Sequence, residues 1–300
     1  MRPEHWHRTE DLDRFLDRAG DFLRSRPAAH TVMLSVTEAV RRRGPGAYGD
    51  EPPVYGTLER DGVVRAAYLQ TPPYPLQVTA LTTEGADSLA AHLAGLGHLV
   101  PGVGGERETA AAFATAWQDR TGATVSLRER QRLYRLDTLT VPEPAPAGRA
   151  RIATASDQPQ LAKWYDEFME AVGEPGIDAG SWADARIAYG GATFWETPDG
   201  TPVAMAGVTP RIAGQVRVAP VYTPAELRGQ GYAGAVTAEV SRAARDAGAD
   251  EVLLFTDLAN PTSNALYQRI GYRPVSDFAV YDVAVGESAA GDSVAGGSVR

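Results

Sequence analysis

One stretch of the chain, residues 216–233, constrains the fold more than any other. It begins as Val-Arg-Val-Ala-Pro-Val-Tyr-Thr, an apolar run typical of a strand, and Pro224 opens a turn. Arg-Gly-Gln-Gly-Tyr-Ala follows at residues 228–233, and from Ala233 small or apolar residues recur every three or four positions up to Gly248. This order predicts a strand, a loop with two glycines and a helix in immediate succession.

The glycine loop at the start of this helix has the properties of an anion site. The first N–H groups of a helix have no intrahelical acceptor, and the helix dipole adds about half a positive charge at that end. Gly229 and Gly231 allow a ligand to approach the backbone where a Cβ would block it. The loop therefore predicts a bound phosphate or pyrophosphate, although an ordinary tight turn between a strand and a helix has a similar local sequence.

Two motifs in this part of the chain resemble those of the GNAT N-acetyltransferase superfamily. Residues 228–233 are similar to the family's Arg/Gln-x-x-Gly-x-Gly/Ala signature, and the expected strand before them has the family's position. Residues 260–272 read Asn-Pro-Thr-Ser-Asn-Ala-Leu-Tyr-Gln-Arg-Ile-Gly-Tyr, which resembles the family's Asn-(x)6-Tyr-(x)3-Gly-Phe/Tyr element. The resemblance covers residues 149–283 and implies the α/β GNAT fold, a mixed central sheet flanked by helices, with acetyl-CoA as co-substrate.

The resemblance also assigns roles to individual residues. The end of the strand would bind the pantetheine arm of acetyl-CoA through its backbone, as if the arm were an added strand. The pyrophosphate would lie on the N–H groups of the glycine loop, and the motif asparagine would hydrogen-bond the cofactor. The cofactor-binding residues implied in this way are Val221, Tyr222, Thr223, Arg228, Gly229, Gln230, Gly231, Tyr232, Ala233 and Asn260.

The chemistry of acetyl transfer needs a partner for the departing thiolate and a base for the amine. Tyr267 matches the family tyrosine near the thioester sulfur, where a phenol stabilises or protonates the thiolate, although a helical tyrosine can equally be a core residue. The base is left open, because residues 215–223 contain no acid and Phe255 occupies the other position at which family members carry a glutamate. The candidates are a chain of water molecules, Glu196, Glu167, Glu170 and Asp257.

Composition excludes several other classes of function. The chain has no cysteine, which excludes disulfides and cysteine nucleophiles, and its five histidines show no metal-ligand spacing, so no metal is expected. A net charge of -9 is unsuited to a general nucleic-acid surface and is compatible with a cationic amine. Without an apolar run of ~20 residues or an apolar leader, we expect a cytoplasmic protein with no membrane segment. The sequence leaves the oligomeric state open.

A Pro/Ala-rich stretch at residues 141–148 predicts a linker between two domains. Residues 1–140 and 149–285 show the same expected order of helices, hairpin and alternating strands, which indicates an internal duplication, and residues 286–300 are expected to be a disordered tail. The first copy reads Leu-Thr-Thr-Glu-Gly-Ala-Asp in place of the glycine loop and lacks the Asn–Tyr element. We therefore expect a degenerate GNAT-like half without its own cofactor.

Glycines, histidines and aromatic residues outside the two motifs give three further expectations. The glycines at residues 102–105 are interpreted as a loop, and His-Trp-His at residues 5–7 as an exposed terminus. In the second half, aromatic residues follow helical spacing and serve either the core or an acceptor pocket. They are Trp164, Tyr165, Phe168 and Trp182.

Taken together, the sequence predicts a tandem GNAT enzyme that moves the acetyl group of acetyl-CoA to a primary amine of a small molecule. Two alternatives stay open. One is a non-catalytic acyl-CoA-binding regulator, since a fold does not prove an activity. The other is an acetyltransferase that acts on a protein N-terminus or side chain.

Overall fold

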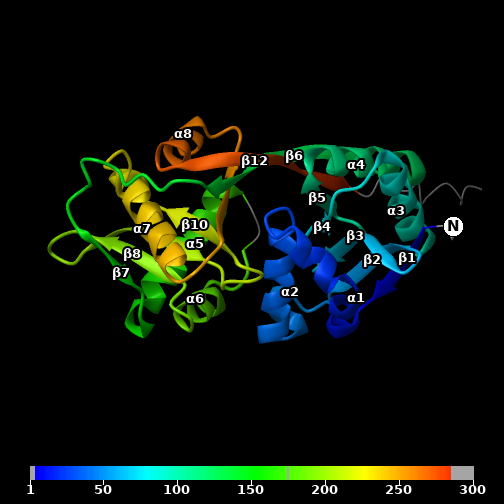
Figure 1. The fold of residues 1–300 in the computed structure, drawn as a ribbon, viewed down its shortest axis with the longest axis horizontal. Coiled ribbons are helices and arrows are strands. Elements are labelled where there is room, and N and C mark those ends of the chain that lie inside the picture. The colour runs from blue at the N-terminus through cyan, green and yellow to red at the C-terminus, as the bar shows by residue number, and fades with distance from the viewer. Residues whose placement is uncertain (1–3, 174–175, 285–300) are drawn as a thin grey trace, which may run out of the picture.

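The computed structural model describes residues 4–173 and 176–284 of the chain. These residues form one mixed, twelve-stranded sheet with helices on both of its faces (Figure 1). The expected tail at residues 286–300 lies outside the described residues. No helix of the described part is both long and apolar enough to span a membrane.

The two halves of the chain repeat one order of elements: a strand, two helices, three strands, and then helix, strand, helix and strand. The first half consists of β1 (His5–Thr9), α1 (Leu12–Ser25), α2 (Thr31–Arg43), the short turn η1 (Pro45–Tyr48), β2 (Val54–Arg60), β3 (Val63–Gln70), β4 (Leu76–Val78), α3 (Thr83–Gly95), β5 (Gly102–Glu106), α4 (Arg107–Thr121) and β6 (Thr124–Leu136). The second half consists of β7 (Arg149–Ile152), η2 (Ala155–Asp157), α5 (Gln158–Val172), α6 (Ala179–Ile187), β8 (Ala192–Glu196), β9 (Pro202–Val208), β10 (Gln215–Tyr222), η3 (Ala225–Leu227), α7 (Tyr232–Asp246), β11 (Glu251–Asp257), α8 (Pro261–Arg269) and β12 (Tyr272–Ala284).

The halves share a single sheet because they exchange their last strands. The strand order is β1-β2-β3-β4-β5-β12-β6-β11-β10-β9-β8-β7. Strand β12 of the second half pairs with β5, and strand β6 of the first half pairs with β11. The two exchanged strands also pair with each other, from Tyr272 opposite Leu136 to Ala284 opposite Thr124. Each half is therefore completed by the main-chain hydrogen bonds of the other.

The helices divide into two layers. In the first half, Tyr68 of β3 packs in the cluster of α3 and α4, whereas its neighbour Leu69 packs in the cluster of α1 and α2. Successive residues of a strand point to opposite faces, so these helix pairs cover opposite sides of the sheet. The second half repeats the pattern, with α7 and α8 opposite α5 and α6. In Figure 1, α1, α2 and α6 lie below the sheet and α4 and α8 above it.

Helix α2 reaches from the first half onto the face of the second half. The hydroxyl of Thr31, at the start of α2, donates a buried hydrogen bond of 2.9 Å to Oε1 of Gln215 on β10. Leu253 of β11 packs in a cluster that includes Leu133 of β6 and the partly buried Ala28. The layer of α1 and α2 therefore lies on the same face of the sheet as α5 and α6, and it meets the second half at β10 and β11.

Two local expectations in the first half were wrong. The glycines at residues 102–105 form strand β5, not a loop: a Cβ at Gly102 would lie 2.5 Å from the carbonyl oxygen of Tyr281, and one at Gly105 2.8 Å from that of Val78. Residues 5–9 form β1, paired with β2; His5 is exposed as expected, whereas Trp6 is only 8% exposed. In both cases, pairing with a distant strand outweighs the local composition.

Candidate functional site

The second half contains two parallel strands that pair over a short distance and then part. β10 and β11 are joined only between residues 215–217 and residues 251–253. Further along, β10 pairs on its other side with β9, and β11 pairs on its other side with β6. The edges of residues 218–222 and 254–257 that face each other have no ladder partner within the described chain. Such edges present backbone groups on which an extended ligand arm can align.

The loop after β10 leads into a helix start that no side chain caps. Gly231 is the N-cap of α7 with φ of +86°, and Gly229 has φ of +80°, so both need the left-handed conformation that glycine adopts freely. Residues 228–231 are exposed, and a Cβ at Gly229 would have no neighbour within 4 Å. The first N–H groups of α7 are therefore available to an external anion.

The linker borders this loop. Pro146 lies 3.8 Å from the position of a Cβ on Gly231, and Pro142 lies 3.5 Å from that of a Cβ on Gly234 in the first turn of α7. Figure 1 shows the green segment after β6 passing the end of α7 on its way to β7. The sequence assigned residues 141–148 only a spacer role, because proximity to α7 leaves no mark on a proline-rich composition.

The sequence-predicted backbone positions on β10 lie at the parted edge. Val221 packs against the cluster of buried residues that also contains Val218 and Leu254. The Oγ1 atom of Thr223 is buried and has no hydrogen-bond partner among the described residues. A buried hydroxyl without a partner is unusual in a folded protein, so Thr223 has a polar atom to offer a ligand. The carbonyl oxygen of Thr223 accepts a hydrogen bond of 3.1 Å from Nε of Arg228.

Tyr267 lies on the buried side of α8, in the same cluster as Val218, Val221 and Leu254. Its side chain is 9% exposed, and its ring meets that of Tyr272 edge-on at 6.1 Å. Burial raises the pKa of Tyr267 to about 12, so the phenol keeps its proton at neutral pH. The structure thus brings Tyr267 together with residues of both parted strands.

Asn260 is the N-cap of α8, and its Oδ1 accepts a hydrogen bond of 3.0 Å from the N–H of Ser263. The helix is held further by Asn264, whose Nδ2 donates to the carbonyl oxygens of Asp257 (2.8 Å) and Asn260 (2.7 Å). Oδ1 of Asn264 accepts a hydrogen bond of 2.9 Å from the hydroxyl of Tyr134 on β6. Sequence reasoning missed Tyr134, because only the strand exchange brings a residue of the first half to α8.

The candidate bases fall into different environments. Oε2 of Glu167 on α5 accepts a hydrogen bond of 2.8 Å from the hydroxyl of Tyr222 on β10. Burial and this contact with a carboxylate raise the pKa of Tyr222 to about 12. Glu170 is exposed on α5, and Asp257 accepts a hydrogen bond from the N–H of Ala259. Glu167 is therefore the candidate connected to β10 by a side-chain contact.

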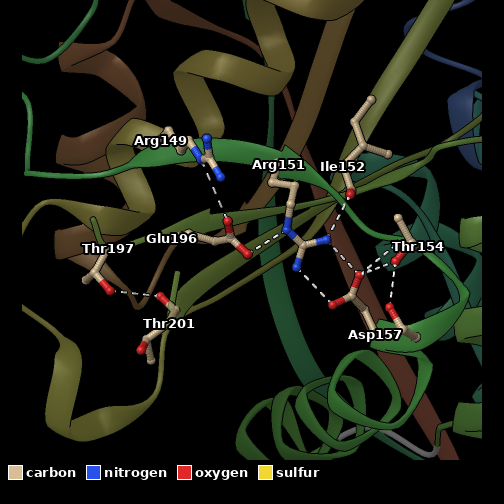
Figure 2. Close-up of polar contacts among 9 residues, drawn as sticks. Arg149, Arg151, Ile152, Thr154, Asp157, Glu196, Thr197 and Thr201 are labelled. Carbon is tan, nitrogen blue, oxygen red and sulfur yellow. Dashed lines mark hydrogen bonds and ion pairs between the residues drawn. The ribbon is translucent and has the colours of Figure 1, made fainter. Parts of the chain in front are cut away.

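Glu196 has a different surrounding, shown in Figure 2. Its carboxylate is 5% exposed and accepts a hydrogen bond of 2.5 Å from Nε of Arg151, with Arg149 at 3.9 Å. Arg151 also donates to both oxygens of Asp157, at 2.7 and 2.9 Å, and holds the pKa of that carboxyl well below its usual range. These contacts join β7 to β8 at the edge of the sheet. Because β9 lies between β8 and β10, the strand that carries Glu196 lies about 10 Å from β10.

The corresponding helix start in the first half offers no such site. The side chain of Thr82 accepts a hydrogen bond of 3.1 Å from the N–H of Gly85, and Glu84 places an acid in the first turn of α3. Only residues 79–82 separate β4 from α3, whereas residues 223–231 separate β10 from α7. The protein's own groups therefore occupy the N-terminus of α3.

Part of the second half of the chain matches a known family. Residues 159–272 match the model of the Acetyltransferase (GNAT) family. No curated protein matches the sequence. A solved GNAT-family acetyltransferase from Colwellia psychrerythraea is 10% identical, with a TM-score of 0.59 over 93% of this chain and 99% of that one.

Two further solved structures have a similar fold. A GCN5-related N-acetyltransferase from Kribbella flavida is 20% identical, with a TM-score of 0.55 over 85% of this chain and 95% of that one. A tandem GNAT protein from the clavulanic acid biosynthesis pathway is 13% identical, with a TM-score of 0.58 over 95% of this chain and all of that one. At these identities the likeness extends to the fold, which is the mixed α/β GNAT architecture expected from the sequence.

The ion pairs of Glu196 with Arg149 and Arg151 are expected to stabilise the fold. Glu196→Gln removes one charge of a buried ion pair and leaves Arg149 and Arg151 less well compensated, so we expect the free energy of unfolding to fall by about 2 kcal/mol. Urea unfolding measures the change. Glu170→Gln is the matched control on the exposed face of α5, with an expected change within about 0.5 kcal/mol. Equal stabilities for the two variants would contradict a structural role for Glu196.

Proposed function

We propose, since the chain belongs to the GNAT acetyltransferase family through residues 159–272, that its second half binds acetyl-CoA and transfers the acetyl group to a primary amine of a small molecule. The observation that carries this proposal is the uncapped, glycine-bearing start of α7 directly beside the parted edges of β10 and β11. One feature suits the pyrophosphate of the co-substrate, and the other suits its extended arm.

In this proposal the co-substrate spans both features. The arm aligns with the backbone of Val221, Tyr222 and Thr223, where the buried hydroxyl of Thr223 supplies a further polar contact. The pyrophosphate lies on the N–H groups of residues 228–233. Arg228 supports it with a positive charge, because its hydrogen bond to Thr223 holds the guanidinium beside the loop. Asn260 contributes its amide N–H groups, since its Oδ1 already caps α8.

The proposed reaction is direct attack of the neutral amine on the thioester. The nitrogen–carbon bond forms, the carbon–sulfur bond breaks, the amine gives up a proton to a base, and CoA leaves as a thiolate. The protein accelerates this step mainly by holding the two reactants in position. For the base we favour Glu167, directly or through a water molecule, because its contact with Tyr222 connects it to β10.

The pKa of Tyr267 defines how the phenol serves the departing thiolate. With a pKa of about 12, the phenol keeps its proton at neutral pH and is available as a hydrogen-bond donor. Tyr267 therefore acts by donating a hydrogen bond to the developing negative charge on sulfur.

A charge substitution in the loop tests co-substrate binding. Arg228→Gln should weaken acetyl-CoA binding about tenfold, or about 1.4 kcal/mol, because a charge beside the pyrophosphate is lost. Calorimetry at two salt concentrations measures the affinity, and the variant should show the weaker salt dependence. Arg242→Gln, near the opposite end of α7, is the control and should bind normally. Unchanged binding by Arg228→Gln would move the pyrophosphate to another site.

Removal of one hydroxyl tests the role of Tyr267. Tyr267→Phe keeps the ring packed, and we expect acetyl-CoA affinity to stay unchanged while kcat falls about 100-fold on an accepted amine. Release of the CoA thiol measures turnover. A loss of affinity and stability with no specific loss of kcat would instead identify Tyr267 as a core residue. Tight acetyl-CoA binding by the wild type with no turnover of any amine would favour a regulator that only binds acyl-CoA.

A further inference from the structure

Two hydrogen-bond donors on β10 are buried without a partner. Nη1 of Arg217 and Nε2 of Gln215 have no acceptor among the described residues, and the side chain of Gln215 is completely buried. The two residues are separated by one position, so both point to the face of the sheet that carries α2 and α6. Buried donors are almost always satisfied in folded proteins, and two neighbouring exceptions indicate a place for a ligand with acceptor atoms.

A second arginine adds to the positive charge at this place. Arg186 of α6 interacts electrostatically with Arg217. Its guanidinium lies 5.3 Å from the ring of Trp182 and donates a hydrogen bond of 2.7 Å to the carbonyl oxygen of Val208. In the described part of the chain, neither Arg186 nor Arg217 forms an ion pair with a carboxylate, in contrast to Arg151 with its two acidic partners.

The first half of the chain takes part in this site. The hydroxyl of Thr31 donates a hydrogen bond to Oε1 of Gln215. The amide N–H groups at Nε2 of Gln215 then remain as donors without an acceptor among the described residues. Burial raises the pKa of the Tyr48 phenol in η1, and Arg186 and Arg217 lie close enough for their positive charges to oppose this larger effect by lowering that pKa. Burial lowers the pKa of Arg217 to about 10, so the guanidinium is still charged at neutral pH. Arg217 therefore places a positive charge at the contact between the two halves.

The position of Arg217 along its strand connects it to the proposed reaction. Arg217, opposite Leu253, is the last residue of β10 that pairs with β11, so it stands where the two strands begin to part. A guanidinium N–H and an amide N–H side by side match the two oxygens of one carboxylate. A buried cation is costly without a counter-charge, and a bound carboxylate would supply one.

We propose that the acetyl acceptor carries a carboxylate as well as its amine, and that Arg217 and Gln215 bind this carboxylate with Arg186 beside them. This inference rests on the proposed acetyl transfer and narrows its acceptor to amino acids and related amino carboxylates. The first half then contributes Thr31 and Tyr48 to the acceptor site, although the capped start of α3 does not bind a co-substrate.

Binding of acetylated product analogues tests the inference without requiring turnover. The probes are pairs that differ by the carboxylate: N-acetylglycine and N-methylacetamide, N-acetyl-β-alanine and N-ethylacetamide, and N-acetyltyrosine and N-acetyltyramine. Calorimetry of the full chain, with CoA present, should show at least one pair in which the acid binds about tenfold tighter or more. Arg217→Met should abolish that preference, and the exposed control Arg211→Met should retain it.

Several results would overturn the inference. One is the absence of a carboxylate preference in every pair, and another is a preference that survives in Arg217→Met. A third is tighter binding of N-acetyl-O-phosphoethanolamine than of N-acetyl-β-alanine, because it would indicate a phosphate site. Should Arg217→Met fail to fold, Arg186→Gln replaces it and should lower the preference several-fold; no loss there counts against the inference.

The experiments distinguish a failure of the proposed acetyl transfer from a failure of the proposed carboxylate site. Carboxylate-dependent binding with no release of CoA thiol from any amine would support the anion site and contradict acetyl transfer. Turnover of amines with no effect of the carboxylate would contradict the anion site alone.

Discussion

The pairing of β6 with β12 joins the two halves of the chain into one sheet. Each strand completes the sheet of the other half, so the main-chain ladder joins two repeats that the linker alone would leave independent. Two consequences reach the candidate site. Tyr134 of β6 donates a hydrogen bond to Asn264 of α8, the helix that carries Tyr267. Helix α2 and η1 lie at the face of β10 that carries Arg217.

The two copies differ most at the start of one helix, and the difference is electrostatic. In the second half, glycines in the left-handed conformation leave the first N–H groups of α7 exposed and uncapped. In the first half, Thr82 caps α3 and Glu84 adds a negative charge. A phosphate is attracted to the first arrangement, and the second repels it. The N-terminus of α7 therefore suits the anionic co-substrate that we propose, and the N-terminus of α3 does not.

Sequence reasoning succeeded where the signal is local. The glycine loop before α7, the hairpins and the spacing between Asn260 and Tyr267 are short-range patterns, and the structure has the expected elements at these positions. It failed for Gly102 and Gly105, which form a strand because β4 and β12 approach closely on either side. The strand exchange and the unpaired Arg217 were equally out of reach, because register between distant strands and the lack of a counter-ion are properties of the assembled fold.

We propose that the second half binds acetyl-CoA and that the first half does not. The stoichiometry of acetyl-CoA binding to the full chain, measured by calorimetry, tests it most directly. The difference between α7 and α3 predicts one molecule per chain. Two molecules per chain would contradict the account, because the capped start of α3 would then bind pyrophosphate as well as the glycine loop does.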